Sequence, residues 1–207
     1  RLSELQQAID DPQVKAIFAV RGGQGCIRLL DQLNLTVLKA HPKWLVGYSD
    51  ITALHAAWAR TGIQSIHGPN AYRFDQLDDR ARQQFFTALE QPPHIEFNHL
   101  QTLHHGSGAG PLVGGNLTLV AAMLGTPDFP PIEGAVLLLE DINEQPYRID
   151  RLLTQLMRAG VFERVAAVAL GRFNSKESHG MDEVLIDRLS QLPCPVVRGL
   201  PVGHKGQ

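Results

Sequence analysis

A serine lies at the tip of the short turn Gly47-Tyr48-Ser49-Asp50. Residues 43–46 have the composition of a buried strand end, and apolar residues at helical spacing follow from Asp50 to Arg60. A serine hydroxyl becomes a nucleophile when it is exposed, rigid and close to a base, and a strand-turn-helix elbow supplies the first two conditions. The alternative is an ordinary helix start, because serine and aspartate are preferred N-caps worth about 1 kcal/mol. The hydrolase fingerprint also expects glycine where this sequence has Ile51, so the turn alone leaves both interpretations open.

A second turn, Arg21-Gly22-Gly23-Gln24-Gly25, follows a buried strand. Successive glycines allow backbone N–H groups to approach an anion closely. The match to a dinucleotide fingerprint is partial because Arg28 occupies the third glycine position, and no Lys-Ser or Lys-Thr pair completes a P-loop. Cys26 is placed at the start of the following helix, where a thiolate is favoured, although such cysteines are more often simply buried.

Acidic residues follow the hydrophobic run Val136–Leu139. A carboxylate at the end of such a strand is typical of the residue that orients a catalytic histidine. Glu140 comes directly after this run, and Asp141 and Glu144, which follow it, compete for the role of that carboxylate. The alternative is a non-catalytic one, because the helix dipole favours acidic residues at the start of a helix.

The histidines suggest two further possibilities. His99, His104 and His105 are close in sequence, but their spacing matches no usual zinc pattern and no cysteine joins them, so no metal is expected. His204 lies in a glycine-flanked turn after the last strand, where a loop histidine can reach an active site or simply lie on the surface.

Composition limits the class of protein. The chain has 207 residues, is 43% hydrophobic and carries a formal net charge of −2, which disfavours nucleic-acid and membrane-surface partners because both rely on dense positive charge. It contains no apolar run long enough to span a membrane. The two cysteines, Cys26 and Cys194, give no framework of bridges, which favours a reducing compartment.

Strands alternate with helices along most of the chain, which predicts an α/β fold with parallel strands and right-handed crossovers. The polar, histidine- and glycine-rich segment 91–112 divides it into an N-terminal domain at 1–90 and a C-terminal domain at 113–207. A helical pattern without a preceding cap begins the chain, and a glycine-rich turn ends it, so we expect both ends to be truncated. Strands are expected at 14–20, 43–46, 64–67, 135–139, 165–170 and 195–197, and helices at 26–33, 50–60, 75–90, 116–124, 147–159 and 181–192.

Six segments together resemble the LD-carboxypeptidase family of serine peptidases, which trims murein tetrapeptides and has relatives that confer immunity to microcin C. The resemblance runs from Val20 to His204, and the block Glu-Asp-Ile-Asn-Glu is its most specific part. The segments, in chain order, are VRGGQGCIRLLDQL, GYSDITALH, IHGPN, GPLVGGNLTLVAAMLGTP, LLLEDINEQPYRIDRLLTQLMRAG and GLPVGH.

The resemblance implies a catalytic triad of Ser49 as nucleophile, Glu140 as the residue that orients the imidazole, and His204 as general base. The serine would lie in an N-terminal α/β domain, with the acid and the histidine in a C-terminal domain. Ile51 is then no defect, because the family's elbow reads Ser-Asp-Ile/Phe-Thr.

The same resemblance implies an oxyanion hole formed by the Asp50 N–H and an N–H of Gly22 or Gly23. Arg21, or the backbone of Gly22 and Gly23, is a candidate for holding the carboxylate of the leaving D-residue. The implied reaction is removal of D-alanine from murein tetrapeptides in cytoplasmic peptidoglycan recycling, by a homodimer without metal or organic cofactor.

Three other interpretations remain. A microcin-immunity-type amidohydrolase would cleave a peptidyl-nucleotide, although the Asn-Glu-x-Pro-Tyr block here is more similar to the murein enzymes. A non-catalytic anion-binding module using Arg21–Gly25 would keep binding after loss of Ser49. A cysteine-dependent hydrolase would use Cys26 instead.

Overall fold

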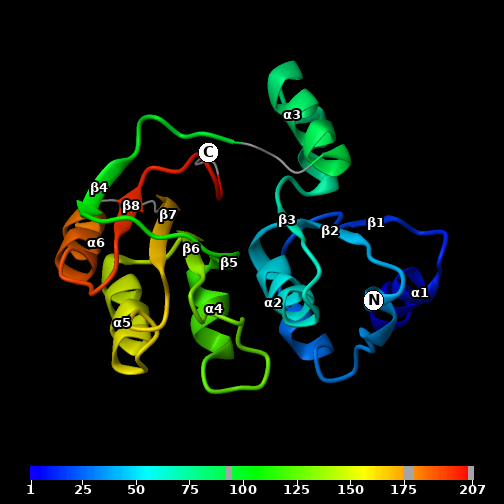
Figure 1. The fold of residues 1–207 in the computed structure, drawn as a ribbon, viewed down its shortest axis with the longest axis horizontal. Coiled ribbons are helices and arrows are strands. Elements are labelled where there is room, and N and C mark those ends of the chain that lie inside the picture. Colours follow the sequence, from blue (N-terminus) through cyan, green and yellow to red (C-terminus); the bar gives the residue numbers. More distant parts are fainter. Residues whose placement is uncertain (92–94, 175–179, 205–207) are drawn as a thin grey trace.

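The computed structural model describes residues 1–91, 95–174 and 180–204 and contains two sheets (Figure 1). The first is a parallel three-stranded sheet in the order β1-β2-β3. Its strands are β1 (Ala16–Phe18), β2 (Trp44–Gly47) and β3 (Ile66–His67), and helix α1 (Leu2–Asp10) precedes them.

The second sheet has five strands in the order β4-β8-β7-β6-β5. Four are parallel, as expected for strands joined by helical crossovers, and β4 pairs antiparallel with β8 at one edge. These strands are β4 (Gln101–His104), β5 (Leu112–Asn116), β6 (Val136–Ile142), β7 (Ala167–Asn174) and β8 (Val196–Arg198).

Helix α2 (Thr52–Thr61) lies between the two sheets, where it packs against β5 and α4 (Leu117–Met123) (Figure 1). It is buried along almost its whole length, including Trp58, and its C-terminus is closed by Gly62 in the left-handed conformation. The other helices are α3 (Asp79–Glu90), α5 (Pro146–Arg158) and α6 (Met181–Leu189).

Each sheet has its own hydrophobic core. Leu139, Leu153 and Leu185 belong to the core of the five-stranded sheet, whereas Leu45 and Trp58 belong to that of the three-stranded sheet. Met123 of α4 is fully buried within the second group, so α4 packs into both halves of the chain. Shared packing of this kind fixes how the two halves are positioned relative to each other.

The expected α/β alternation is confirmed, with three differences in detail. The helix expected to run to Leu33 after the glycine turn is only a 3-10 helix, Cys26–Leu29. Strand β5 had no strong signal because Gly114 and Gly115, both at positive φ, dilute its apolar pattern. Within the segment expected to link two domains, β4 joins the edge of the second sheet.

Among the described ranges, no helix combines the length and apolarity that crossing a bilayer would demand.

Candidate active site

The serine turn adopts an unusual backbone conformation. Ser49 follows β2 and begins a 3-10 helix, Ser49–Ile51, that continues into α2, and its φ is 68°. A left-handed conformation in a residue with a Cβ costs roughly 1–2 kcal/mol and is concentrated at functional sites. Ser49 follows a buried strand but is itself only half-buried, so solvent and substrate can reach this residue.

The glycine turn lies directly against this serine. A Cβ added to Gly22 would come 2.8 Å from the Ser49 Cβ, closer than real Cβ atoms approach, and 3.0 Å from its Oγ. Only glycine therefore permits the backbone of residues 21–23 to approach the hydroxyl. Gly23, at φ 128°, has open space around it.

Asp50 ties the two turns together. Its carboxylate is buried, and Oδ2 accepts a hydrogen bond of 3.0 Å from the backbone N–H of Cys26. The Cys26 side chain is buried in the core, where burial and the Asp50 charge raise the thiol pKa to about 12. Of the two interpretations of Cys26, simple burial is confirmed, and burial beside a carboxylate disfavours the thiolate. A buried thiol with a raised pKa is a poor nucleophile, which disfavours a cysteine-dependent hydrolase.

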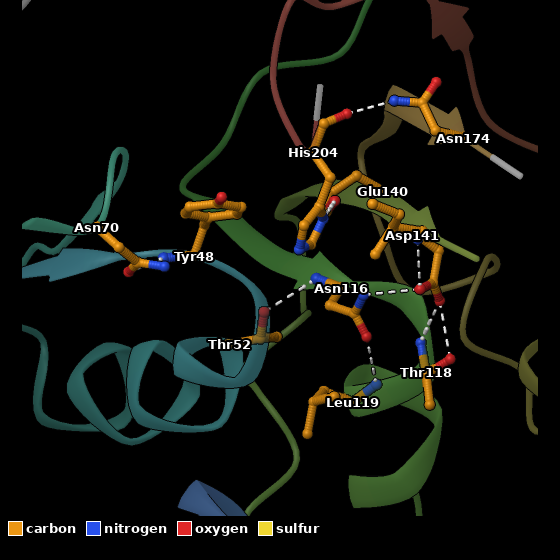
Figure 2. A network of polar contacts seen from close by, with 11 residues as sticks. Tyr48, Thr52, Asn70, Asn116, Thr118, Leu119, Glu140, Asp141, Asn174 and His204 are labelled. Atoms are coloured by element: carbon orange, nitrogen blue, oxygen red, sulfur yellow. Dashed lines mark hydrogen bonds and ion pairs between the residues drawn. The ribbon is translucent and has the colours of Figure 1, made fainter. Parts of the chain in front are cut away.

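Glu140 and His204 form a pair on the second sheet (Figure 2). Nδ1 of His204 lies 2.9 Å from Oε2 of Glu140, whose side chain is fully buried at the C-terminal end of β6. The backbone carbonyl of His204 accepts a hydrogen bond from the side-chain amide of Asn174 at the end of β7. Strand ends of the second sheet thus hold both the ring and the backbone of the histidine.

The aromatic ring of Tyr48 brings the serine turn and the histidine together. Tyr48 is buried beside Ser49 in the chain, and its ring packs edge-to-face on that of His204, with ring centroids 4.7 Å apart (Figure 2). Its backbone N–H donates to Oδ1 of Asn70 at 3.3 Å, which anchors the turn to the segment after β3. The two sheets therefore bring these predicted site residues into one region.

Asp141 and Glu144, the competing candidates for the acid, interact with residues other than His204. The buried Asp141 accepts hydrogen bonds from the Asn116 side chain at 2.8 Å and from the Thr118 backbone and hydroxyl, which holds the start of α4. Glu144 lies 3.2 Å from Arg148 one helical turn away. In this structure only Glu140 of the three acids is paired with the histidine.

Two further histidines lie close to the serine turn: His55 is buried, and His67 is half-buried with both ring nitrogens shielded from solvent. His55 Nε2 hydrogen-bonds the Gly47 carbonyl at 2.9 Å, and Nδ1 accepts from the Ser65 hydroxyl at 2.8 Å. Burial lowers the pKa of His55 to about 4 and that of His67 to about 3. Both rings are neutral near pH 7, so they add no charge close to His204.

His99, His104 and His105 are close in sequence and have separate surroundings in the fold. His104 belongs to β4, and its Nδ1 hydrogen-bonds the carbonyl of Ser190, while His99 and His105 are exposed. In the described part of the chain, no three His, Cys, Asp or Glu side chains converge as metal ligands would.

Sequence reasoning missed the contacts that join the halves. Asn116 caps α4 through its side chain, and its backbone N–H donates to Oγ1 of Thr52 at 2.9 Å. A Cβ on the neighbouring Gly115 would come 2.6 Å from the same Thr52 oxygen. The paired glycines before Asn116 are the one signal of this close approach that the sequence contains.

Comparison with known proteins agrees with this geometry. Residues 1–68 match the LD-carboxypeptidase N-terminal domain, and residues 109–207 match the LD-carboxypeptidase C-terminal domain. A protein of Synechocystis sp. that bears the name of a carboxypeptidase is 39% identical over all of this chain and 70% of its own. The murein tetrapeptide carboxypeptidase of Pseudomonas aeruginosa is 33% identical over all of this chain and 73% of its own.

Solved structures show the same fold. The muramoyltetrapeptide carboxypeptidase of Oxalobacter formigenes superposes with a TM-score of 0.82 at 34% identity, covering 99% of this chain and 74% of that one. An MccF-like protein of Bacillus anthracis superposes with a TM-score of 0.84 at 24% identity, covering 100% of this chain and 73% of that one. At this identity the similarity is one of fold.

These matches define the class of protein as a serine-type carboxypeptidase. The chain belongs to the LD-carboxypeptidase family.

Proposed function

We propose that this protein releases the terminal D-alanine of murein tetrapeptides through a Ser-His-Glu acyl-enzyme mechanism. The observation that carries the proposal is the buried Glu140 carboxylate 2.9 Å from His204 Nδ1, with the Tyr48 ring joining that histidine to the Ser49 turn. A carboxylate on Nδ1 keeps Nε2 unprotonated and able to accept a proton. The relatives named as murein peptide carboxypeptidases supply the substrate class.

In the proposed first step, Nε2 of His204 takes the hydroxyl proton as Ser49 Oγ attacks the carbonyl of the L-centre before the D-residue. The negative charge of the tetrahedral intermediate is placed at the Asp50 N–H and an N–H of Gly22 or Gly23. Each such donor is worth about 3 kcal/mol in the transition state. The contact of Gly22 with Ser49 supports this placement.

In the second step, His204 donates its proton to the leaving nitrogen, and D-alanine departs. Water then attacks the acyl group on Ser49, with His204 as base again, and the tetrapeptide leaves as a tripeptide. Glu140 stays ionised and stabilises the imidazolium form of His204 in both steps.

The proposal extends to the organisation of the molecule. Residues 1–90 would form the nucleophile domain, 91–112 the linker and 113–207 the domain of acid and base. The enzyme would act in cytoplasmic peptidoglycan recycling as a homodimer, which sedimentation equilibrium of the purified protein tests.

Mass spectrometry of a murein tetrapeptide incubated with the full-length protein tests the reaction. We expect loss of one alanine mass with the native serine and none with the folded Ser49→Ala variant. Absence of alanine loss from both would overturn the murein assignment, and cleavage of a peptidyl-nucleotide instead would establish the microcin-type reaction.

A further inference from the structure

Two arginines are brought beside the serine turn by backbone hydrogen bonds. The N–H groups of Ala71 and Tyr72 donate to the carbonyls of Ala19 and Val20 at 2.9 and 3.0 Å. These bonds lay the start of the 3-10 helix Ala71–Gln76 along the strand extension that leads into Arg21. Because the backbone at Gly22 lies against Ser49, this arrangement places Tyr72, Arg73 and Arg21 near the serine turn.

The side chain of Arg73 is held by its neighbour. Its Nε donates to the Tyr72 hydroxyl at 2.8 Å, and its guanidinium carbon lies 5.3 Å from the centre of the Tyr72 ring. No described residue accepts a hydrogen bond from the two terminal nitrogens of Arg73. The guanidinium is thus oriented, yet it keeps the pair of donors that binds a carboxylate in bidentate fashion.

The charges of both arginines are also unpaired among the described residues. Within the described ranges, no carboxylate forms an ion pair with Arg21 or Arg73, whereas Arg60, Arg164 and Arg198 each have one. Hydrogen bonding from Arg73 lowers the pKa of the Tyr72 hydroxyl, and the positive charges of Arg73 and Arg21 add to this effect. The Tyr72 hydroxyl therefore lies beside two positive charges that no carboxylate of the described residues pairs with.

The pair is connected to the reacting centre through Tyr48. Burial and the neighbouring Tyr72 side chain raise the pKa of Tyr48 to about 12, and the Tyr48 ring packs on His204 with centroids 4.7 Å apart. A group bound at the arginines consequently lies within a few side chains of the serine and of the histidine.

We propose that Arg21 and Arg73, positioned by Tyr72, form the subsite for the free carboxylate at the C-terminus of the peptide substrate. This inference rests on the proposed function, since an exopeptidase must recognise the chain end as well as the scissile bond. The carboxylate would bind the two guanidinium groups and, once bound, would fix which peptide bond reaches Ser49.

A pair of substrates tests the subsite: a murein tetrapeptide with its C-terminal carboxylate and the same peptide as its C-terminal amide. With the full-length protein, we expect kcat/KM for the acid to exceed that for the amide by about 100-fold, the worth of charge-assisted hydrogen bonds. In Arg21→Gln and in Arg73→Gln, this preference should fall by about tenfold, through the acid substrate alone. Tyr72→Phe should lower it through loss of the bond to Arg73.

Arg28→Gln is the matched control, because Arg28 is an exposed arginine on the neighbouring 3-10 helix. It should leave the preference unchanged. A native-like preference in both Arg21→Gln and Arg73→Gln would overturn the subsite, as would an equal loss on acid and amide. Equal loss would place the arginines at another carboxylate of the peptide. If the native protein cleaves neither peptide, the proposed function itself fails, which distinguishes the two results.

Discussion

The Nδ1 atom of His204 lies 2.9 Å from Oε2 of Glu140, a carboxylate with no solvent exposure. Gly203 makes this approach possible: a Cβ there would come 2.8 Å from the same oxygen, and its φ is 101°. A buried carboxylate is costly unless it is paired, so the histidine stabilises the acid as much as the acid orients the histidine.

Glu140→Gln should lower kcat by about 10²- to 10⁴-fold, because an amide no longer fixes the tautomer or stabilises the imidazolium. The measurement is kcat for tetrapeptide cleavage at pH 7, with circular dichroism to confirm folding. Glu144→Gln is the control and should keep kcat, since Glu144 pairs with Arg148 rather than with the histidine. A Glu140→Gln enzyme within threefold of native kcat would rule out the proposed role.

Ser49→Gly and Ser49→Ala should both be inactive but should differ in stability. The φ of 68° at this position strains any residue with a Cβ, and glycine relieves that strain. We expect the Gly variant to be more stable than the Ala variant by about 1 kcal/mol in urea unfolding. Equal stability would show that the turn relaxes when the hydroxyl is absent.

Gly22→Ala should reduce kcat by about 100-fold, because its Cβ would displace the Ser49 side chain and a shift near 1 Å has that effect. Gly62→Ala is the matched comparison. Gly62 closes α2 at φ 79° with nothing within 4 Å, so alanine there should cost about 1 kcal/mol of stability and leave kcat intact. Native kcat in Gly22→Ala would disprove the close contact.

Acid should destabilise the fold through His55 and His67. Their pKa values are about 4 and about 3 in the fold, below the ordinary 6.5 that they regain on unfolding. The unfolded chain therefore binds more protons below pH 6.5, so stability is complete above that pH and is lost as pH falls through the folded values. The slope is about 1.4 kcal/mol per pH unit for each histidine.

Urea midpoints between pH 7 and pH 4.5 measure this slope. Replacing His55 by Asn should destabilise the fold at pH 7, where the bonds to Ser65 and Gly47 are lost, and should flatten the curve below pH 6.5. An unchanged slope would mean that His55 is protonated in the fold.

Strongly periodic elements were predictable from the sequence, and elements shaped by long-range contacts were not. The apolar runs and caps of α3 and α5 indicated helices within a few residues of their observed bounds, Asp79–Glu90 and Pro146–Arg158. Strand β4 was not predictable, because its pattern is polar and it exists through pairing with β8. The segment after Gly25 forms only the 3-10 helix Cys26–Leu29, which its apolar pattern did not distinguish from a longer helix.

The candidate site shows the same division. Residue types and family resemblance indicated Ser49, Glu140 and His204, and the structure brings the last two into direct contact. It could not be predicted that Asp141 would be taken up by Asn116 and Thr118, since helix capping and catalysis favour the same residue type. The ring of Tyr48 on His204 depends on two sheets meeting, which no local pattern encodes.

The division of the site between two sheets also determines when, during synthesis of the chain, hydrolytic activity can begin. Ser49 lies in the part of the chain that is translated early, and His204 follows β8, the last strand described. Because domains fold as they leave the ribosome, a nascent chain would carry a folded elbow with no base to deprotonate it. On the proposed mechanism, hydrolysis begins only when Val202–His204 has been synthesised and His204 has reached Glu140. The order of the residues along the chain therefore delays activity until synthesis has passed His204.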